Sequence, residues 1–184
     1  SIRNNLGVVT DGANTKVEAD SFLTGYDVNL VVSTGPAAGT YAGRGALFGA
    51  SWANTDGVAG TLEIVNDGAG ASTTDGCEPL VGFTPGNFAF IDRGTCQFGV
   101  KSLNAEQAGA SGVVIADNVT GALINMAPGT VGRQVTIPAM SITLADATTI
   151  RATRPQSASY DGVTAWGMHA NGFPLLYTPT TMEP

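Results

Sequence analysis

Charged residues are scarce in this sequence of 184 residues, and most of them are negative. They make up 12% of the chain, and 15 Asp and Glu against 8 Lys and Arg give a formal net charge of −7. Only Lys16 and Lys101 are lysines. A sequence-independent nucleic-acid surface needs clustered Lys and Arg to release counterions from phosphates. The composition therefore argues against a nucleic-acid partner.

Several features that carry chemistry or span membranes are also missing. His169 is the single histidine, and no G-x-S-x-G, H-E-x-x-H or glycine-rich phosphate-loop motif is present. A serine hydrolase needs a base beside its nucleophile, and a catalytic zinc needs several His, Cys or carboxylate ligands. No run of about 20 apolar residues occurs, so we expect no membrane span. The sequence predicts no catalytic residue, no bound metal and no cofactor.

Acidic residues in turns leave one catalytic alternative open. The segments Asp11 to Asn14 and Asp67 to Gly70 lack the alternating oxygen ligands and the closing Glu of an EF-hand loop, so bound calcium stays open only as a minor alternative. Two carboxylates at a defined distance could still act as an acid and base pair. An enzyme with an unrecognised carboxylate pair therefore stays open as a minor alternative.

Cysteine occurs only twice, at Cys77 and Cys96. The two residues are 19 positions apart and both follow turn-forming residues, which favours a disulfide over two unrelated buried thiols. Closing a loop of this length stabilises a fold by about 3 kcal/mol in the chain-entropy model. A disulfide implies an oxidising compartment, so we expect a secreted or extracytoplasmic protein. The start at Ser1 without a leader suggests an excised part of a longer protein.

Glycine, by contrast, is abundant, with 25 residues, and five Asp-Gly pairs mark turns between short apolar runs. In Gly60–Val65, the apolar and polar residues alternate, as in a strand with one wet face. The run Val113–Ala116 is apolar throughout and predicts a strand that is buried on both faces. The runs that predict strands are Tyr26–Val32, Ala46–Gly49, Gly60–Val65, Asn87–Ile91, Gly112–Ala116, Ala139–Thr143 and Val163–Met168.

Two segments have helical spacing. The first begins at Phe98 and ends at Gly109, with Asn104 and Gln107 pointing away from the sheet. Its buried stripe consists of Phe98, Ser102, Ala105 and Ala108. The second helix begins after Thr143, which we predict to be its N-cap, and runs towards Ala152.

Between the strand Asn87–Ile91 and the first helix lies a short turn with a concentration of polar residues. Glycine at position 94 permits a sharp reversal after Arg93, and the expected disulfide would make the exposed turn rigid. Arg93 has five fixed donors that suit a carboxylate or the carbonyls of a bound peptide. The alternative is that Arg93 pairs with a nearby acid such as Asp92 or caps carbonyl groups of the loop. We expect Lys101 to lie on the surface, with its stem along the helix.

The segments FIDRGTCQFGVKSLNAEQAGASGVVIADN from Phe90 and IPAMSITLADA from Ile137 resemble the protease-associated domain, or PA domain. That family has a strand ending in I-D-R-G-x-C-x-F, a helix with K-x-x-x-A-x-x-A-G-A, a buried strand ending in N, and a later I-P-x-x-x-I. The resemblance covers residues 57–152. It departs from the family at Leu144–Ala147, where a frequent glycine is missing.

The resemblance implies an α+β, mainly β fold: an open β-barrel or sandwich-like core flanked by two or more short helices. We expect a single PA-like domain over residues 1–184, with residues 1–56 and 153–184 extending the family core. The implied function is a non-catalytic protein-interaction module of a secreted multidomain protein such as a peptidase, which recruits, binds or positions polypeptide substrates. The alternative is a structural insert that packs against a catalytic domain of the same chain.

The resemblance also implies roles for four residues of the turn. Arg93 would be a polar contact to a bound peptide, and Gly94 would allow close approach of the peptide backbone. Cys96 and Phe98 would support the turn from the protein side. These four residues are our peptide-binding candidates.

Overall fold

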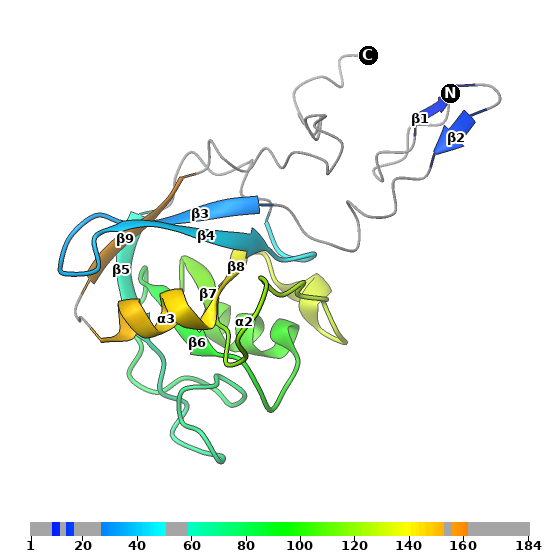
Figure 1. The fold of residues 1–184 in the computed structure, drawn as a ribbon. Coiled ribbons are helices and arrows are strands. Elements are labelled where there is room, and N and C mark those ends of the chain that lie inside the picture. Colours follow the sequence, from blue (N-terminus) through cyan, green and yellow to red (C-terminus); the bar gives the residue numbers. More distant parts are fainter. Residues whose placement is uncertain (1–8, 12–13, 17–26, 51–58, 153–155, 162–184) are drawn as a thin grey trace.

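The computed structural model describes residues 9–11, 14–16, 27–50, 59–152 and 156–161 (Figure 1). The expected strand Val163–Met168, His169 and most of the expected extensions lie outside these residues. Strands β1 (Val9–Asp11) and β2 (Asn14–Lys16) form a two-stranded antiparallel sheet of their own.

The seven remaining strands form one barrel in the order β3-β4-β8-β7-β6-β5-β9. Strand β9 pairs with both β3 and β5, and these pairings close the ring. Strands β5 to β8 are parallel to one another where they pair, and the other pairs are antiparallel. The bounds are β3 (Asp27–Val32), β4 (Gly39–Gly45), β5 (Ala59–Ile64), β6 (Phe88–Asp92), β7 (Gly112–Ala116), β8 (Ala139–Ile142) and β9 (Gln156–Asp161).

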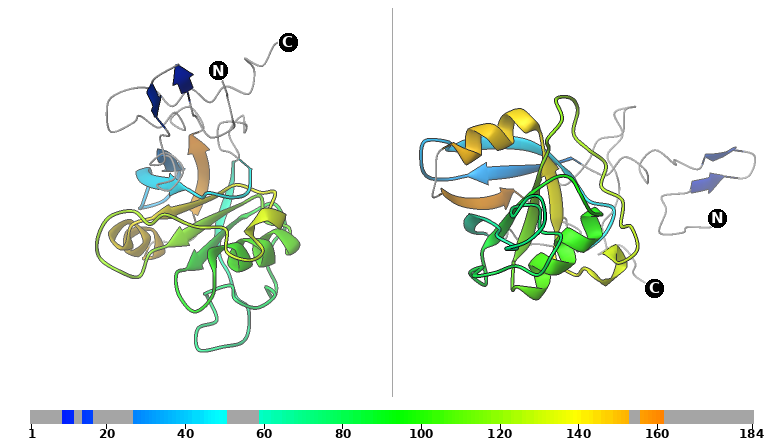
Figure 2. Two further views of the ribbon diagram at one scale, coloured as in Figure 1. Left: turned by 90° about the vertical axis from the view of Figure 1, so that its right-hand side faces the viewer. Right: turned by 90° about the horizontal axis from the view of Figure 1, so that it is seen from below.

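Two α-helices flank the barrel, and a short 3-10 helix, η2 (Gly132–Gln134), follows β7. Helix α2 (Phe98–Gln107) and helix α3 (Leu144–Arg151) lie against opposite faces of β6 and β7 (Figure 2). The expected N-cap is confirmed, because Thr143 Oγ1 accepts the N–H of Asp146 at 3.2 Å. The predicted fold class, α+β and mainly β with a barrel-like core and short helices, is therefore confirmed.

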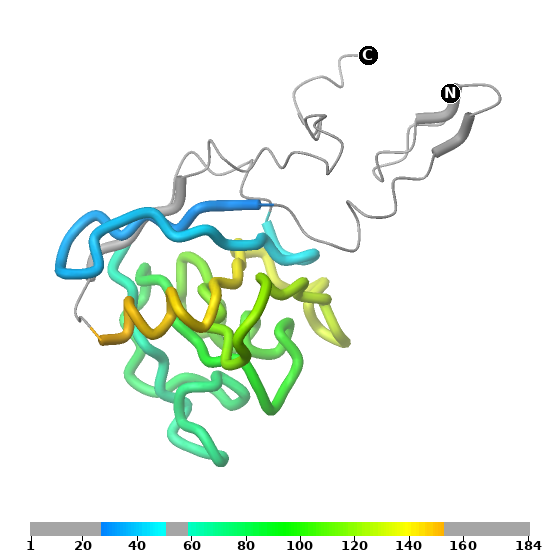
Figure 3. The backbone as a smooth tube through the Cα atoms, in the orientation of Figure 1, coloured from blue at the N-terminus to red at the C-terminus, as the bar shows by residue number. Residues whose placement is uncertain are grey.

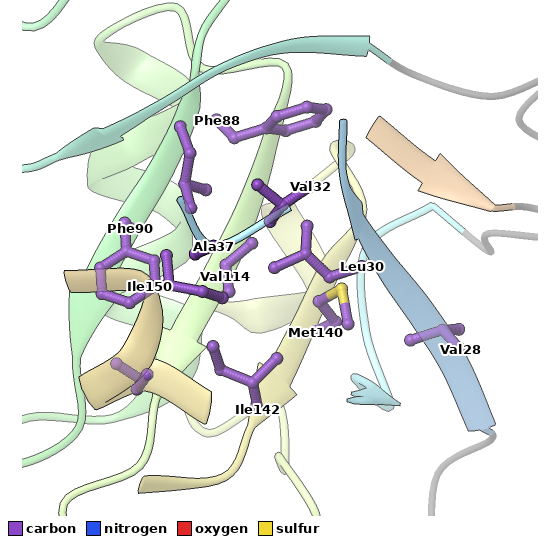
Figure 4. Close-up of a cluster of buried hydrophobic side chains, with 13 residues drawn as sticks. Val28, Leu30, Val32, Ala37, Phe88, Phe90, Val114, Met140, Ile142 and Ile150 are labelled. Carbon is purple, nitrogen blue, oxygen red and sulfur yellow. The ribbon is translucent and has the colours of Figure 1, made fainter. Parts of the chain in front are cut away.

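The core consists of two apolar clusters separated by β6 and β7. In Figure 4, side chains from β3, β6, β7, β8 and α3 converge on the first cluster, which includes Phe90 and Val114. The second cluster holds the alternate residues Ile91 and Ile115 together with Ala105 of α2. All residues of β7 are buried, so the prediction of a strand without a wet face is confirmed.

Residues Ala46–Gly49, which we expected to form a strand, do not form one, and residues 47–49 form bends instead. The side chains of Ala46 and Phe48 are buried in the second cluster, which explains their apolar character. The N–H groups of Ala46 and Leu47 donate to the carbonyls of Ala139 and Met126, which belong to two different segments, so the residues do not pair with one strand. The sequence also failed to predict β4 and β9, whose residues are mostly small or polar.

Strand β4 has a glycine at position 43 because its backbone lies very close to β8 there. A Cβ on Gly43 would lie 2.0 Å from Met140 Cε and 2.8 Å from the Ser141 carbonyl oxygen. Such distances are too short for a carbon atom, so a side chain at Gly43 would push β4 away from β8. This glycine is required by packing, although it weakens the strand signal in the sequence.

We expect Gly43→Ala to lower the free energy of unfolding by about 1–3 kcal/mol, because the methyl group overpacks the contact between β4 and β8. The matched control is Gly39→Ala in the same strand, where the nearest atom to a new Cβ is 3.9 Å away. Urea unfolding followed by fluorescence measures both values. Equal stability of the two variants would contradict the proposed close packing.

Candidate functional site

A cavity of about 530 Å³ lies where β6 and β7 end, between these strand ends and α3. The segment between β5 and β6, teal in Figure 3, extends away from the barrel and contributes Ser72 and Asp75 to the wall. In sheets with parallel strands, ligands commonly bind outside the carboxyl ends of those strands. The remaining lining residues are Asp92, Arg93, Gly94, Thr95, Ala116, Asp117, Asn118, Leu144, Ala147, Thr148 and Arg151.

Arg93 forms an ion pair with Asp117, the residue that follows β7. Arg93 Nη1 lies 2.8 Å from Asp117 Oδ1, and the Asp117 side chain is buried while that of Arg93 is 34% exposed. The same oxygen also accepts the backbone N–H groups of Asn118 and Val119. The alternative that Arg93 pairs with an acid is thus correct, but the acid is Asp117 and not Asp92.

Asp92 pairs with Arg151 from the last turn of α3. Both terminal nitrogens of Arg151 donate to the carboxylate of Asp92, which also accepts the Thr74 hydroxyl at 2.5 Å. The guanidinium carbon of Arg151 lies 5.3 Å from the centre of the Phe90 ring, which adds a cation–π contact. Arg151 was not among the predicted site residues, because nothing in the sequence indicates a pairing between positions 59 residues apart.

The turn after β6 has an unusual backbone conformation. Gly94 has φ = 127°, which favours glycine, and Thr95 has φ = 62°, which is rare for a β-branched residue. The Arg93 N–H donates to the Ala116 carbonyl at 2.9 Å, and Asn118 Nδ2 donates to the Arg93 carbonyl at 3.1 Å. These bonds hold the turn against the end of β7.

The disulfide between Cys77 and Cys96 is present, with the two Cα atoms 5.8 Å apart. The alternative of two unrelated thiols is therefore wrong. Neither Cys96 nor Phe98 lines the cavity, and Phe98 packs against the second apolar cluster. The structure thus brings two of the four peptide-binding candidates, Arg93 and Gly94, to the cavity. Their role in binding stays a prediction.

Lys101 is buried, which contradicts our expectation of a surface residue. Its side chain has 0% exposure, and Nζ donates to the Asp75 carbonyl and to Cys77 Sγ, the latter at 3.3 Å. Burial lowers the pKa of Lys101, although the nearby carboxylates of Asp75 and others act in the opposite direction. Asn104, which we expected to point away, donates to the Gly76 carbonyl at 3.0 Å. Polar side chains of helix α2 therefore hold the segment Asp75–Cys77 in place.

Three carboxylates near the disulfide could hold a hard cation such as Ca²⁺. One oxygen each of Asp67, Asp75 and Glu78 lies within 4.8 Å of the others. Asp67 Oδ2 and Asp75 Oδ1 both accept the Cys77 N–H, at 3.1 and 3.2 Å. The ammonium of Lys101 lies nearby and supplies positive charge. The prediction that the chain binds no metal stays a prediction.

Asp75 connects this group to the cavity. Burial alone would raise the pKa of Asp75, but hydrogen bonds from Thr95 and the Cys77 N–H, together with Lys101, lower it on balance below 3.8. Ionised Asp75 therefore stabilises the fold above pH 3.8, and this contribution is lost as the pH falls through the lowered pKa.

We expect Asp75→Asn to lower the free energy of unfolding at pH 7 by about 1–3 kcal/mol, because charge-assisted hydrogen bonds are lost. The difference from wild type should begin to shrink below pH 3.8, where the carboxyl group of the unfolded chain becomes protonated, and should vanish as the pH falls through the lowered pKa of the folded state. Denaturant unfolding between pH 2 and 7 measures this. The control is Asp27→Asn, whose side chain is 67% exposed. A difference that stays constant with pH would contradict this role of Asp75.

Similar sequences include parts of peptidases and of sorting receptors. The chain is 50% identical over 50 residues to an aminopeptidase of Pseudomonas aeruginosa, a match that covers 26% of this chain and 9% of that protein. It is 54% identical over 39 residues to vacuolar-sorting receptor 3 of Arabidopsis thaliana, covering 21% of this chain and 6% of the receptor. The chain thus matches less than a tenth of the length of either relative.

Solved structures with a similar fold include two proteases. The zinc aminopeptidase BSAP from Bacillus subtilis matches with a TM-score of 0.56 at 21% identity, over 75% of this chain and 30% of BSAP. The subtilisin-like protease Apa1 of Pseudoalteromonas sp. AS-11 matches with a TM-score of 0.53 at 16% identity, over 77% of this chain and 34% of Apa1. At these identities the likeness concerns the fold alone.

Membership of a family rests on the match to a family model. The PA domain model matches residues 52–150, which is more than half of the chain and close to the 57–152 expected from the motifs. None of the helices in the described ranges is long and apolar enough to cross a membrane. The matched residues include β5 to β8, α2 and almost all of α3. The chain belongs to the PA domain family.

Proposed function

We propose that this chain is a non-catalytic interaction module of an exported multidomain protein, and that it binds or positions polypeptides at the cavity beside Arg93. The observation that carries this proposal is the position of Arg93. Arg93 lines the cavity, its side chain is 34% exposed, and its guanidinium is held by the buried carboxylate of Asp117 at 2.8 Å. A donor that is fixed before binding loses little conformational entropy when a ligand arrives.

The other three candidates have complementary roles in this proposal. Gly94 lines the cavity without a side chain, so a peptide backbone can come close to the turn. Cys96 links the turn to Cys77, and Phe98, at the start of α2, packs against the second apolar cluster. We propose that these two residues support the turn and do not contact the ligand.

The carboxylates that line the cavity support the proposal that the chain is not an enzyme. Asp92 and Asp117 are each ion-paired to an arginine, and both also accept other hydrogen bonds. A general acid or base must reach the proton that it transfers to or from the substrate, whereas the oxygens of these two carboxylates are already engaged by groups of the protein itself. They therefore make a poor acid and base pair for hydrolysis.

The parent protein is proposed to be a peptidase or a related hydrolase in a luminal or extracellular location. Support comes from the disulfide, which favours an oxidising compartment, and from relatives named aminopeptidase and vacuolar-sorting receptor. The chain matches only fractions of these proteins, as expected for an accessory domain. We further propose that residues 1–184 form a single domain. The alternative function is a structural insert whose cavity faces a catalytic domain of the same chain.

The proposal predicts that Arg93→Ala weakens peptide binding about tenfold, because one or more charge-assisted hydrogen bonds are lost. Fluorescence anisotropy of the 184-residue chain with a pool of labelled random dodecapeptides measures binding. Arg133→Ala, an exposed arginine on η2 outside the cavity, is the matched control. Absence of binding by the wild-type chain would favour the packing role, and cleavage of the pool would favour an enzyme.

A further inference from the structure

We propose that Arg151 is a second ligand-contacting residue, and that Arg93 and Arg151 together bind the main-chain carbonyl oxygens of a neutral or basic polypeptide. This inference rests on the proposed function of the cavity and names its ligand class. Arg151 is absent from the candidates that the sequence suggested.

The two arginines belong to different walls of the same cavity. Arg93 follows β6 and Arg151 ends α3, and their side chains are 34% and 36% exposed. Each guanidinium is held by an ion pair with one carboxylate, that of Asp117 for Arg93 and that of Asp92 for Arg151. The contact with the Phe90 ring restrains the second guanidinium further. The cavity therefore holds two positioned groups of donors before any ligand binds.

Both arginines have N–H groups for which no contact is found within the described residues. A guanidinium has five N–H groups. The contacts within the described residues involve Nη1 of Arg93 and the two terminal nitrogens of Arg151. Asp117 Oδ1, in contrast, already accepts from Arg93 and from two backbone N–H groups. A ligand that binds to the remaining N–H groups of the two arginines must supply acceptors.

The charge of the cavity decides which acceptors fit. The lining contains two arginines and three aspartates, Asp75, Asp92 and Asp117, which gives a net charge of −1. The whole chain carries −7. Each guanidinium is already neutralised by its partner, so an additional carboxylate would meet a negative environment. Peptide carbonyls are neutral acceptors, and basic side chains of the ligand would be attracted at long range.

The test uses the wild-type chain and three labelled dodecapeptide pools that are degenerate at the same positions. Two further positions are fixed, and both are Lys in the first pool, Gln in the second and Glu in the third. We expect the Glu pool to bind at least about tenfold more weakly than the Lys pool, with a difference that decreases with added salt. Arg151→Gln should weaken binding of the Gln pool about tenfold, whereas Arg133→Gln should leave it unchanged.

A contact role is separated from a structural role by NMR. On addition of the Gln pool to the wild-type chain, the Nε–Hε signals of Arg93 and Arg151 should both shift, while that of Arg133 should not. An unchanged Arg151 signal, or tightest binding of the Glu pool, would overturn the inference about Arg151. In that case the proposed function of the cavity would still stand if Arg93→Gln weakens peptide binding. If no pool binds the wild-type chain, both fail. The NMR result decides the matter even if Arg151→Gln does not fold.

Discussion

Asp92 and Arg93 are neighbours in the chain, and each forms an ion pair with a different element of the fold. Asp92 pairs with Arg151 at the end of α3, and Arg93 pairs with Asp117 at the end of β7. Successive residues of an extended chain point to opposite sides, so one dipeptide can hold two walls of a cavity. The positions of both guanidiniums depend on this pair of interactions.

The barrel and the disulfide put these interactions in place. Strands β6 and β7 pair in parallel with Asp92 opposite Ala116, so Asp117 follows at the same edge of the sheet. On the other side of the turn, Cys96 is joined to Cys77, and buried Lys101 donates to the Asp75 carbonyl. The turn is thus fixed at both ends, which agrees with a role in presenting donors to a partner.

Much of this arrangement follows from patterns that are local in the sequence. The continuous apolar run of β7, the cap at Thr143 and the two cysteines beside turns were sufficient to predict a strand, a helix start and a disulfide. β4 was missed because Gly43 is required by its contact with Met140, and such a contact has no local signature. Lys101 was misplaced because its partners are 24 and 26 positions away. Asp92 and Asp117 stand at the ends of the consecutive strands β6 and β7, and this pattern in the sequence could have predicted the cavity.

The central claim is that the turn after β6 is held rigidly by its contacts with β7 and by the disulfide. The backbone N–H of Arg93, which donates to the Ala116 carbonyl at 2.9 Å, reports on this directly. Hydrogen exchange of this amide, followed by NMR with the disulfide intact and then reduced, is the most direct measurement. We expect slow exchange in the oxidised chain and much faster exchange after reduction, with the amides of β7 still protected. Fast exchange of the Arg93 amide in the oxidised chain would contradict it.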